Sequence, residues 1–151
     1  MDDLAFEIRK LSEMYAFTSL QMHETIGRKA GLTGTDHKYL GFIMKKGKMT
    51  AGEISILTGL TSGSVTALID RFEKKKLVKR EHAKDDRRKV FVVPNSEKIM
   101  KLFEPLYREF RKETENLISS FSNDEKKILQ SYFSKAIDVM NKTTCQINNK
   151  K

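Results

Sequence analysis

The chain has 151 residues, of which 29 are Lys or Arg and 20 are Asp or Glu, so its formal net charge is +9 at pH 7. Only 38% of the residues are hydrophobic and the mean hydropathy is −0.53. No apolar run approaches the roughly 18 residues that a membrane-spanning helix needs. These values exclude an integral membrane protein and predict one domain, or two halves of one architecture.

Features near both ends of the chain predict its compartment. The sequence opens with Met1-Asp2-Asp3 and lacks the basic region and apolar stretch of a secretory signal. Cys145 is the only cysteine, which excludes an intramolecular disulfide and a multi-thiolate metal site. We therefore expect a cytoplasmic protein.

The first 46 residues predict two helices. Apolar side chains recur at alternating steps of four and three over residues 4–26, which is typical of one long amphipathic helix. Its stripe consists of Leu4, Ile8, Leu11, Tyr15, Thr18, Met22 and Ile26. Gly31 and Gly34 follow this helix, and a second helical face around Ile43 ends near Gly47.

Two short helices are predicted next. Thr50 and Glu53 have the spacing of a capping box, which opens a helix that ends at Gly59. Thr61 is placed to cap a further helix. The apolar positions of that helix are Val65, Leu68, Ile69 and Phe72.

The rest of the chain predicts a hairpin and two long helices. Strand-like runs at 77–81 and 90–93 flank a polar tip at 84–88. A helix is predicted from Ser96, and Ser122 with Glu125 forms a second capping box that opens the last helix. We expect the polar residues after Thr143 to form a frayed tail.

This order of elements predicts a mainly α fold with a small β-hairpin, namely a winged helix-turn-helix flanked by long helices. The apolar stripes of these long helices predict a helical dimerisation domain. We assign residues 1–31 to an N-terminal dimerisation helix and 32–94 to the winged helix-turn-helix. Residues 95–144 form C-terminal dimerisation helices, and 145–151 form the tail.

Positive charge is concentrated in the predicted winged helix. Between Arg71 and Lys89, ten Lys or Arg accompany four Asp or Glu, a net charge of 10 − 4 = +6. Such a density favours nucleic acid as a partner, and the predicted winged helix makes double-stranded DNA the first candidate. The alternative is an ordinary solvated face.

The second short helix has the side chains of a DNA-reading helix. Its face opposite the apolar stripe begins with small, uncharged residues, which let a helix enter a major groove. The predicted DNA-binding residues of this helix and its end are Thr61, Ser62, Gly63, Ser64, Thr66, Arg71, Lys74 and Lys75. Arg71 and the lysines would contact phosphates, whereas the alternative is that the hydroxyls only cap the helix.

The hairpin tip adds Lys84, Asp86, Arg87 and Arg88 to the predicted interface. An arginine at a wing tip suits a minor groove. We expect Asp86 to hold the Arg88 side chain extended through a charge-assisted hydrogen bond. The alternative is an ordinary turn in which turn chemistry favours Asp.

Together these residues resemble the MarR family of bacterial transcriptional regulators. The resemblance rests on Leu32-Thr33, Val65-Thr66, Asp70-Arg71, Leu77-Val78 and Asp86-Arg87-Arg88. It implies a homodimer that binds a pseudo-palindromic operator, with Ser62, Ser64 and Thr66 in the major groove and Arg88 in the minor groove. Ala67, Lys76 and Asp36 depart from the family pattern, which often has arginine, glycine and glutamine there.

Packing also predicts a dimer. The first helix is about 35 Å long at about 1.5 Å per residue, too long to bury its stripe on a winged helix of some sixty residues. Pairing two copies covers the stripe and spaces two recognition helices for successive major grooves. The alternative is a monomeric helical bundle.

The family resemblance also implies a pocket for a small aromatic or anionic effector. Candidates to line it are Tyr15, Phe17, Tyr39, Phe42 and Met44, with plain core packing as the alternative. We expect no cofactor, no metal site and no enzyme, because the sequence lacks a catalytic motif. Convergence of His23, Glu24 and His37 on a metal is the remaining alternative to that expectation.

Two functions therefore remain open. The first is a sequence-specific transcriptional regulator, and the resemblance favours a ligand-responsive repressor. The second is a helical protein-interaction or RNA-binding module that uses the same winged helix. The salt dependence of binding separates them, because neutralising several phosphates makes affinity fall steeply with salt.

Overall fold

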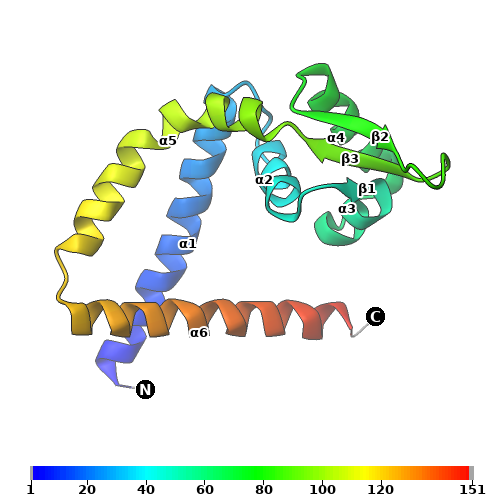
Figure 1. Ribbon diagram of the computed structural model, residues 1–151. Helices are drawn as coiled ribbons and strands as arrows, with labels where there is room; N and C mark the ends of the chain where they lie inside the picture. The colour runs from blue at the N-terminus through cyan, green and yellow to red at the C-terminus, as the bar shows by residue number, and fades with distance from the viewer. Residues whose placement is uncertain (1, 150–151) are drawn as a thin grey trace. The chain divides into compact units, whose positions relative to one another are not determined.

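A computed structural model describes residues 2–149 (Figure 1). Within that range the elements are α1 (Asp3–Lys29), α2 (Asp36–Lys46), β1 (Met49–Thr50), α3 (Ala51–Thr58), α4 (Ser62–Lys74), β2 (Val78–His82), β3 (Val90–Pro94), α5 (Ser96–Ser119) and α6 (Asn123–Asn148). The prediction of a mainly helical fold with a small sheet is confirmed. The chain divides into two compact units, one ending at Tyr107 and the other beginning at Arg108.

The hydrophobic core of the first unit lies among α2, α3, α4 and the sheet. The predicted apolar face of α4 is buried in it, and Phe72 and Leu40 have no exposed surface. The buried cluster comprises Leu32, Leu40, Ile43, Met49, Ile54, Val65, Leu68, Ile69, Phe72, Leu77, Val78, Val92, Ile99 and Phe103. This core fixes which side of α4 faces outwards.

The helix-turn-helix has the ends that the sequence predicts. The Thr50 side chain accepts a hydrogen bond from the Glu53 amide, and the Glu53 carboxylate accepts one from the Thr50 amide, which completes the capping box. Gly59 ends α3 with φ +73°, a left-handed conformation that glycine adopts without strain. No single helix within residues 2–149 could cross a membrane; α3 and α4 together meet the length and composition test but are bent by 110°.

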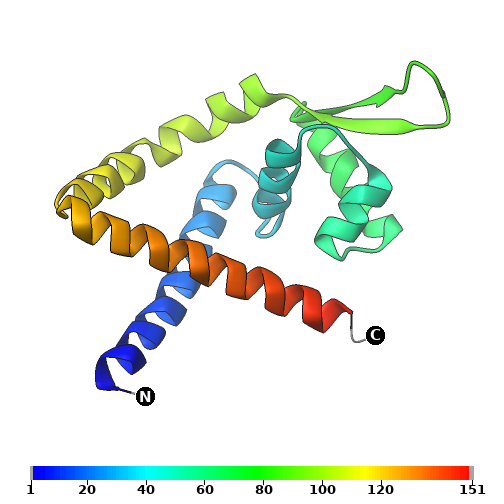
Figure 2. The same cartoon turned by 60° about the horizontal axis from the view of Figure 1, so that its bottom comes forward.

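The sheet has three antiparallel strands in the order β1-β3-β2. The hairpin of β2 and β3 was predicted. Strand β2 lies one residue later than the predicted range 77–81, at Val78–His82, and β3 continues one residue beyond the predicted range 90–93, to Pro94. Strand β1 was not predicted, because two residues carry no alternation pattern. Its Met49 pairs with Val92 and places one more apolar side chain in the core. Figure 2 shows the hairpin extending beyond the helices of this unit.

Helix α1 is closely packed only near its C-terminal end. Gly27 is its one buried residue, and a Cβ added there would lie 2.7 Å from Cβ of His37 on α2. Glycine at this position therefore permits the close approach of α1 and α2. Earlier in α1, Leu4 is 70% exposed and Leu11 is 60% exposed. The predicted stripe exists, but a single chain leaves its N-terminal half in solvent.

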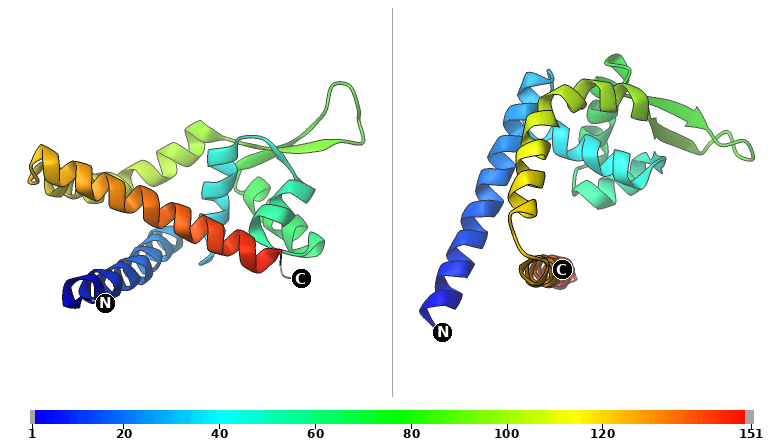
Figure 3. Two further views of the ribbon diagram at one scale, coloured as in Figure 1. Left: turned by 90° about the horizontal axis from the view of Figure 1, so that it is seen from below. Right: turned by 60° about the vertical axis from the view of Figure 1, so that its left-hand side comes forward.

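Helix α6 in the second unit is one uninterrupted rod (Figure 3). Its predicted capping box is present, with Ser122 and Glu125 bonded reciprocally. The expectation of a frayed tail after Thr143 is wrong for residues 144–148, because α6 continues to Asn148. No helix-breaking residue intervenes, and Ile147 extends the apolar face about two turns beyond Met140. Residues 150 and 151 of the expected tail lie outside the described range.

Candidate nucleic-acid interface

The exposed face of α4 begins with the predicted small residues. Thr61, Ser62, Gly63, Ser64 and Thr66 are all exposed, while Val65 between them is buried. The Thr61 hydroxyl oxygen accepts a hydrogen bond from the Ser64 amide at 3.3 Å, which caps the helix. Thr61 is therefore a cap, as the alternative interpretation held, while the residues after it present an uncharged surface.

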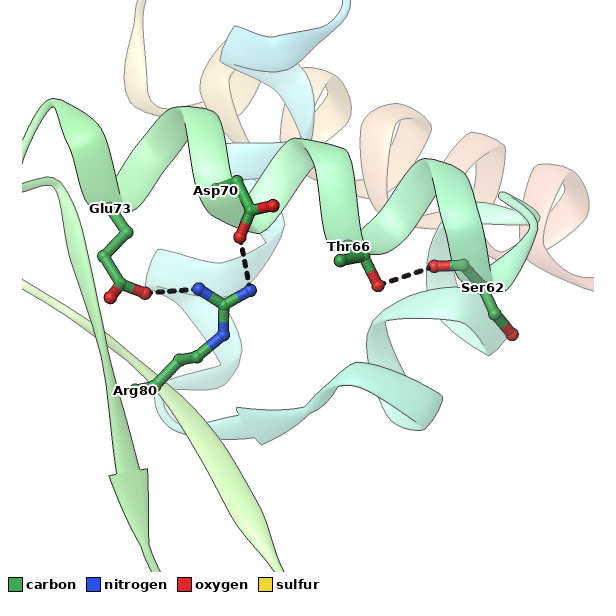
Figure 4. Close-up of polar contacts among 5 residues, drawn as sticks. All are labelled: Ser62, Thr66, Asp70, Glu73 and Arg80. Atoms are coloured by element: carbon green, nitrogen blue, oxygen red, sulfur yellow. Dashed lines mark hydrogen bonds and ion pairs between the residues drawn. The ribbon is translucent and has the colours of Figure 1, made fainter.

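The hydroxyls on this face differ in what they can still do. Thr66 donates its hydroxyl hydrogen to the Ser62 carbonyl at 3.0 Å (Figure 4), and Thr61 donates to the Ser64 hydroxyl oxygen at 3.0 Å. Thr66 Oγ1 can then act towards a ligand only as an acceptor, whereas its methyl group remains an apolar contact. The Ser62 side chain points into solvent in the same view.

Arg71 was predicted to contact phosphate, and the structure gives its guanidinium another partner. Nε and Nη2 both donate to the Asp36 carboxylate at 2.9 Å. Asp36 is 4% exposed, and its hydrogen bonds raise the pKa of Arg71. Because the two residues are 35 positions apart, no spacing rule could have paired them. The arginine ties α4 to α2, which makes it a structural residue first.

The lysines at the end of α4 remain exposed. Lys74 and Lys75 lie in the last turn and at its C-cap, where positive charge also suits the helix dipole. Lys76 follows with φ +57°, a left-handed conformation that favours glycine. The chain thus turns into β2 with a lysine instead, at the cost of some strain.

Three residues that the sequence interpretation did not select form a cluster beside the predicted interface. Arg80 on β2 donates from Nη2 to Asp70 and from Nη1 to Glu73, each at 2.6 Å (Figure 4). These bonds, led by the one to Asp70, raise the pKa of Arg80. Asp70 and Glu73 were visible as an i, i+3 acidic pair, but only the fold shows their shared partner.

The wing tip is built from backbone hydrogen bonds. The Asp86 carboxylate accepts from the Arg88 amide at 2.9 Å, and the Asp86 carbonyl accepts from the Lys89 amide at 3.0 Å. His82 Nδ1 lies 2.8 Å from the Arg87 carbonyl oxygen and donates to it. The expectation that Asp86 holds the Arg88 side chain is not met within residues 2–149; Asp86 shapes the turn instead, as its alternative interpretation proposed. The side chains of Lys84, Arg87 and Arg88 are exposed.

The predicted effector residues do not form one site. Tyr15 and Phe17 are 63% and 74% exposed, and the rings of Tyr39 and Phe42 contact one another in a tilted arrangement with centroids 6.5 Å apart. Of these residues, Met44 lines a cavity of about 270 Å³ in the first unit, and the other four do not line that cavity. The other lining residues are Leu20, His23, His37, Lys38, Gly41, Ile99, Phe103 and Tyr107.

Two histidines meet in this cavity. The Tyr107 hydroxyl lies 2.5 Å from Nδ1 of His23 and 3.2 Å from Nε2 of His37. Burial, followed by the charge of His23, lowers the pKa of His37. Glu24 does not line the cavity, and within the described part of the chain no three His, Cys, Asp or Glu residues are grouped to hold a metal ion.

Comparisons with known proteins agree with this geometry. A sequence model described as the MarR family matches residues 30–89. The uncharacterized HTH-type transcriptional regulator YcgE of Bacillus subtilis is 38% identical over 118 residues, covering 78% of this chain and 76% of that protein. The HTH-type transcriptional regulator MhqR of the same organism is 30% identical over 115 residues, covering 76% and 78%.

Solved structures share the fold. A MarR family protein from Bacillus stearothermophilus superposes with a TM-score of 0.72 at 24% identity, covering 93% of this chain and 99% of that one. A point mutant of S. aureus MepR bound to an oligodeoxyribonucleotide superposes with a TM-score of 0.58 at 20% identity, with the same coverage.

Proposed function

This chain belongs to the MarR family of transcriptional regulators, and from that premise we propose that it binds a pseudo-palindromic DNA operator as a homodimer and acts as a ligand-responsive repressor. The relatives named above carry the coarse function, transcriptional regulation. The operator, the dimer and the effector are proposals that rest on the residues of this chain.

The observation that carries the proposal is the division of α4 into two faces. One face is fully buried, from Val65 to Phe72, so α4 cannot rotate about its axis without exposing the core. The other begins with Ser62, Ser64 and Thr66, whose side chains are too small to hold a helix away from base edges. Such a face suits a major groove about 12 Å wide.

The phosphates and the minor groove would be met by the residues around this helix. Lys74 and Lys75 offer exposed ammonium groups for the backbone. Arg87 and Arg88 extend from the wing tip, where the Asp86 turn holds their backbone. A guanidinium at that place suits a narrow minor groove, whose negative potential is enhanced.

The homodimer is supported by apolar surface that a single chain leaves exposed. No residue of α6 is buried, although several of its side chains are large and apolar. Among them, Ile128 is 69% exposed, Ile137 56% and Met140 58%. The N-terminal half of the apolar stripe of α1 is also exposed to solvent. Rows of exposed apolar side chains on each of these helices favour an interaction site, and a second copy offers matching rows.

The cavity beside Met44 is the proposed effector site. Its walls are largely apolar, Lys38 supplies a positive charge, and His23 and His37 supply imidazole groups that can form hydrogen bonds. A volume of about 270 Å³ admits one small aromatic ring with an acidic group. Tyr15, Phe17, Tyr39 and Phe42 take no part in this proposal, because none of them lines the cavity.

Selection of random duplex DNA by the purified chain tests the proposed function. We expect a palindromic consensus, and we expect Arg88→Ala to bind it about 10- to 100-fold more weakly, because one minor-groove contact is lost. Arg9→Ala removes the same charge from α1, where Arg9 pairs with Glu13, and should bind as the parent does. Equal binding by Arg88→Ala and the parent would remove the wing from the interface.

A second substitution tests the helix. Ser64→Glu places a negative charge among phosphates and base edges, so it should abolish recovery of the consensus while the protein stays folded. Unchanged recovery would mean that this face of α4 does not enter the groove.

Salt titration separates the proposal from a protein-interaction or RNA-binding module. For duplex DNA, log affinity should fall against log salt with a slope of about −0.9 for each phosphate neutralised. Weak binding to every duplex, without a consensus, together with tighter binding to RNA or to a protein, would favour the second function.

A further inference from the structure

The proposed DNA-reading face of α4 does not stay uncharged along its length. Residues 62, 66, 70 and 73 recur at steps of four, four and three, so they lie along one side of the helix. Figure 4 shows Ser62, Thr66, Asp70 and Glu73 in this order. Two carboxylates therefore continue the row of hydroxyls that the proposed function places against DNA.

Both carboxylates are accessible to solvent. The Asp70 side chain is 60% exposed and the Glu73 side chain is 42% exposed. Two bare negative charges beside a DNA backbone would oppose binding, since like charges brought together at an interface cost affinity. Within α4, Arg71 cannot compensate for them, because its guanidinium is bonded to Asp36.

Arg80 is the residue that meets both acids. It lies in β2, opposite Val92 of the central strand, and its guanidinium reaches across to α4. One nitrogen bonds to Asp70 and another to Glu73, each at 2.6 Å, in the forked geometry that makes arginine–carboxylate pairs strong. Its side chain is 34% exposed, less than either acid.

We propose that Arg80 is a positioning residue for DNA binding, which acts through Asp70 and Glu73 by neutralising the two carboxylates on the DNA-reading side of α4. This inference rests on the proposed function, because it concerns the same face of the same helix. Arg80 itself makes no contact with DNA in this proposal. Its two bonds are directed at the acids, and they use both terminal nitrogens of the guanidinium.

The test is a set of substitutions that separates neutralisation from direct contact. The single variant Arg80→Met keeps the aliphatic stem and loses the charge. The double variant Asp70→Asn/Glu73→Gln removes the two acids and keeps Arg80. The triple variant combines all three changes, and each protein is titrated against the labelled consensus duplex and against a random-sequence duplex of equal length.

Neutralisation predicts a specific pattern. Arg80→Met should bind the consensus duplex about tenfold more weakly, because the two acids become uncompensated. The triple variant should recover to within about threefold of the parent, with the parent's salt slope. Direct contact predicts instead that the triple variant stays as weak as Arg80→Met, with a salt slope smaller by about 0.9. That result would overturn the inference.

Lys79→Met is the matched control. Lys79 precedes Arg80 on β2, points to the opposite side of the sheet, and bonds to Glu81 at 2.5 Å. Its removal takes the same charge from the same strand without exposing Asp70 or Glu73, so it should weaken binding less than threefold. A tenfold loss in this control would show that the net charge of the wing, and not the Arg80 cluster, sets the affinity.

Folding is checked by circular dichroism for every variant. If Arg80→Met does not fold, the double and triple variants give the answer by themselves, since both lack the acids. Equal affinity of these two supports neutralisation, and a tenfold weaker triple variant contradicts it. If the parent shows no preference for any duplex, the proposed function fails, and that outcome is distinct from failure of the rescue.

Discussion

The winged helix and the last helix use the same local signals and bury different amounts of apolar surface. Each has a capping box, Thr50 with Glu53 in one and Ser122 with Glu125 in the other. In the winged helix the apolar face that follows is enclosed, and Ile54 is 1% exposed. In α6 no residue is buried. Local sequence thus forms a helix in both places, but only the winged helix finds its packing partners within one chain.

The two regions therefore differ in how much their packing within one chain contributes to stability. A buried face gains free energy from the area removed from water, about 25 cal/mol per Å². Helix α6 has 26 residues and gains little of this free energy within one chain, because helices in proteins are stabilised mostly by packing of their apolar face and that of α6 is exposed. The winged helix should therefore behave as an independent folding unit, and α6 as a surface that a second copy completes.

A substitution in the winged-helix core should cause the greatest loss of stability. Phe72→Ala should lower the free energy of unfolding by about 3–5 kcal/mol, because the ring is completely buried and its removal leaves a cavity. Urea titration measures this. The matched control is Ile56→Ala on α3, where the side chain is 86% exposed and the change should stay within about 0.5 kcal/mol. Similar losses in the two variants would contradict the assigned core.

A charge on the exposed apolar face of α6 tests whether that face forms the proposed dimer interface. Met140→Glu should raise the dimer dissociation constant at least about 100-fold, because it places a charge in an apolar interface. Sedimentation equilibrium measures this, with helix content checked by circular dichroism. Ser131→Glu adds the same charge elsewhere on α6, on the side that also carries Lys127 and Lys135, and should leave the dimer intact. Dissociation of both variants would point to net charge and away from the apolar face.

The sequence predicts those features of the fold that depend on near neighbours along the chain, and it misses those that depend on distant partners. Helix limits at Thr61 and Ser122 depend on contacts within four residues, and the sequence predicts them correctly. Strand β1 escapes prediction because it has two residues and exists only by pairing with β3. The tail was predicted from polarity alone, which overlooked Ile147 in register with the apolar face.

The candidate site likewise has features that the sequence predicts and contacts that only the fold shows. The small exposed face of α4 follows from helical periodicity, so Ser62, Ser64 and Thr66 could be placed outward without a structure. The partners of arginines could not, because Asp36 is 35 residues from Arg71 and Asp70 is ten from Arg80. Which carboxylate a long side chain reaches is decided by how the elements pack, and a charge count along the sequence treats such arginines as available.

The pH dependence of stability tests the burial of His37 in the first unit. Burial lowers the pKa of His37 from its ordinary value of 6.5, so below that value the unfolded chain binds more protons than the folded one. The stabilising effect of neutral His37 is complete above pH 6.5 and is lost as the pH falls below it, by at most about 1.4 kcal/mol per pH unit. Unfolding by urea between pH 7.5 and 5.5 should show this slope reduced in His37→Gln. An identical slope in that variant would assign the pH dependence to other groups.

The smallest effect uses the two capping boxes themselves. In a monomeric Met140→Glu background, Thr50→Ala should lower the free energy of unfolding of the winged helix by about 1 kcal/mol, since the lost cap belongs to a helix packed on the core. Ser122→Ala removes the equivalent cap from α6 and should change that free energy by less than about 0.3 kcal/mol, because α6 opens without disturbing the core. Its effect should appear instead as faster amide exchange in the first turn of α6. If Ser122→Ala destabilised the monomeric winged helix as much as Thr50→Ala does, α6 would have to be coupled to that core within one chain, and its exposed face would no longer argue for a second copy.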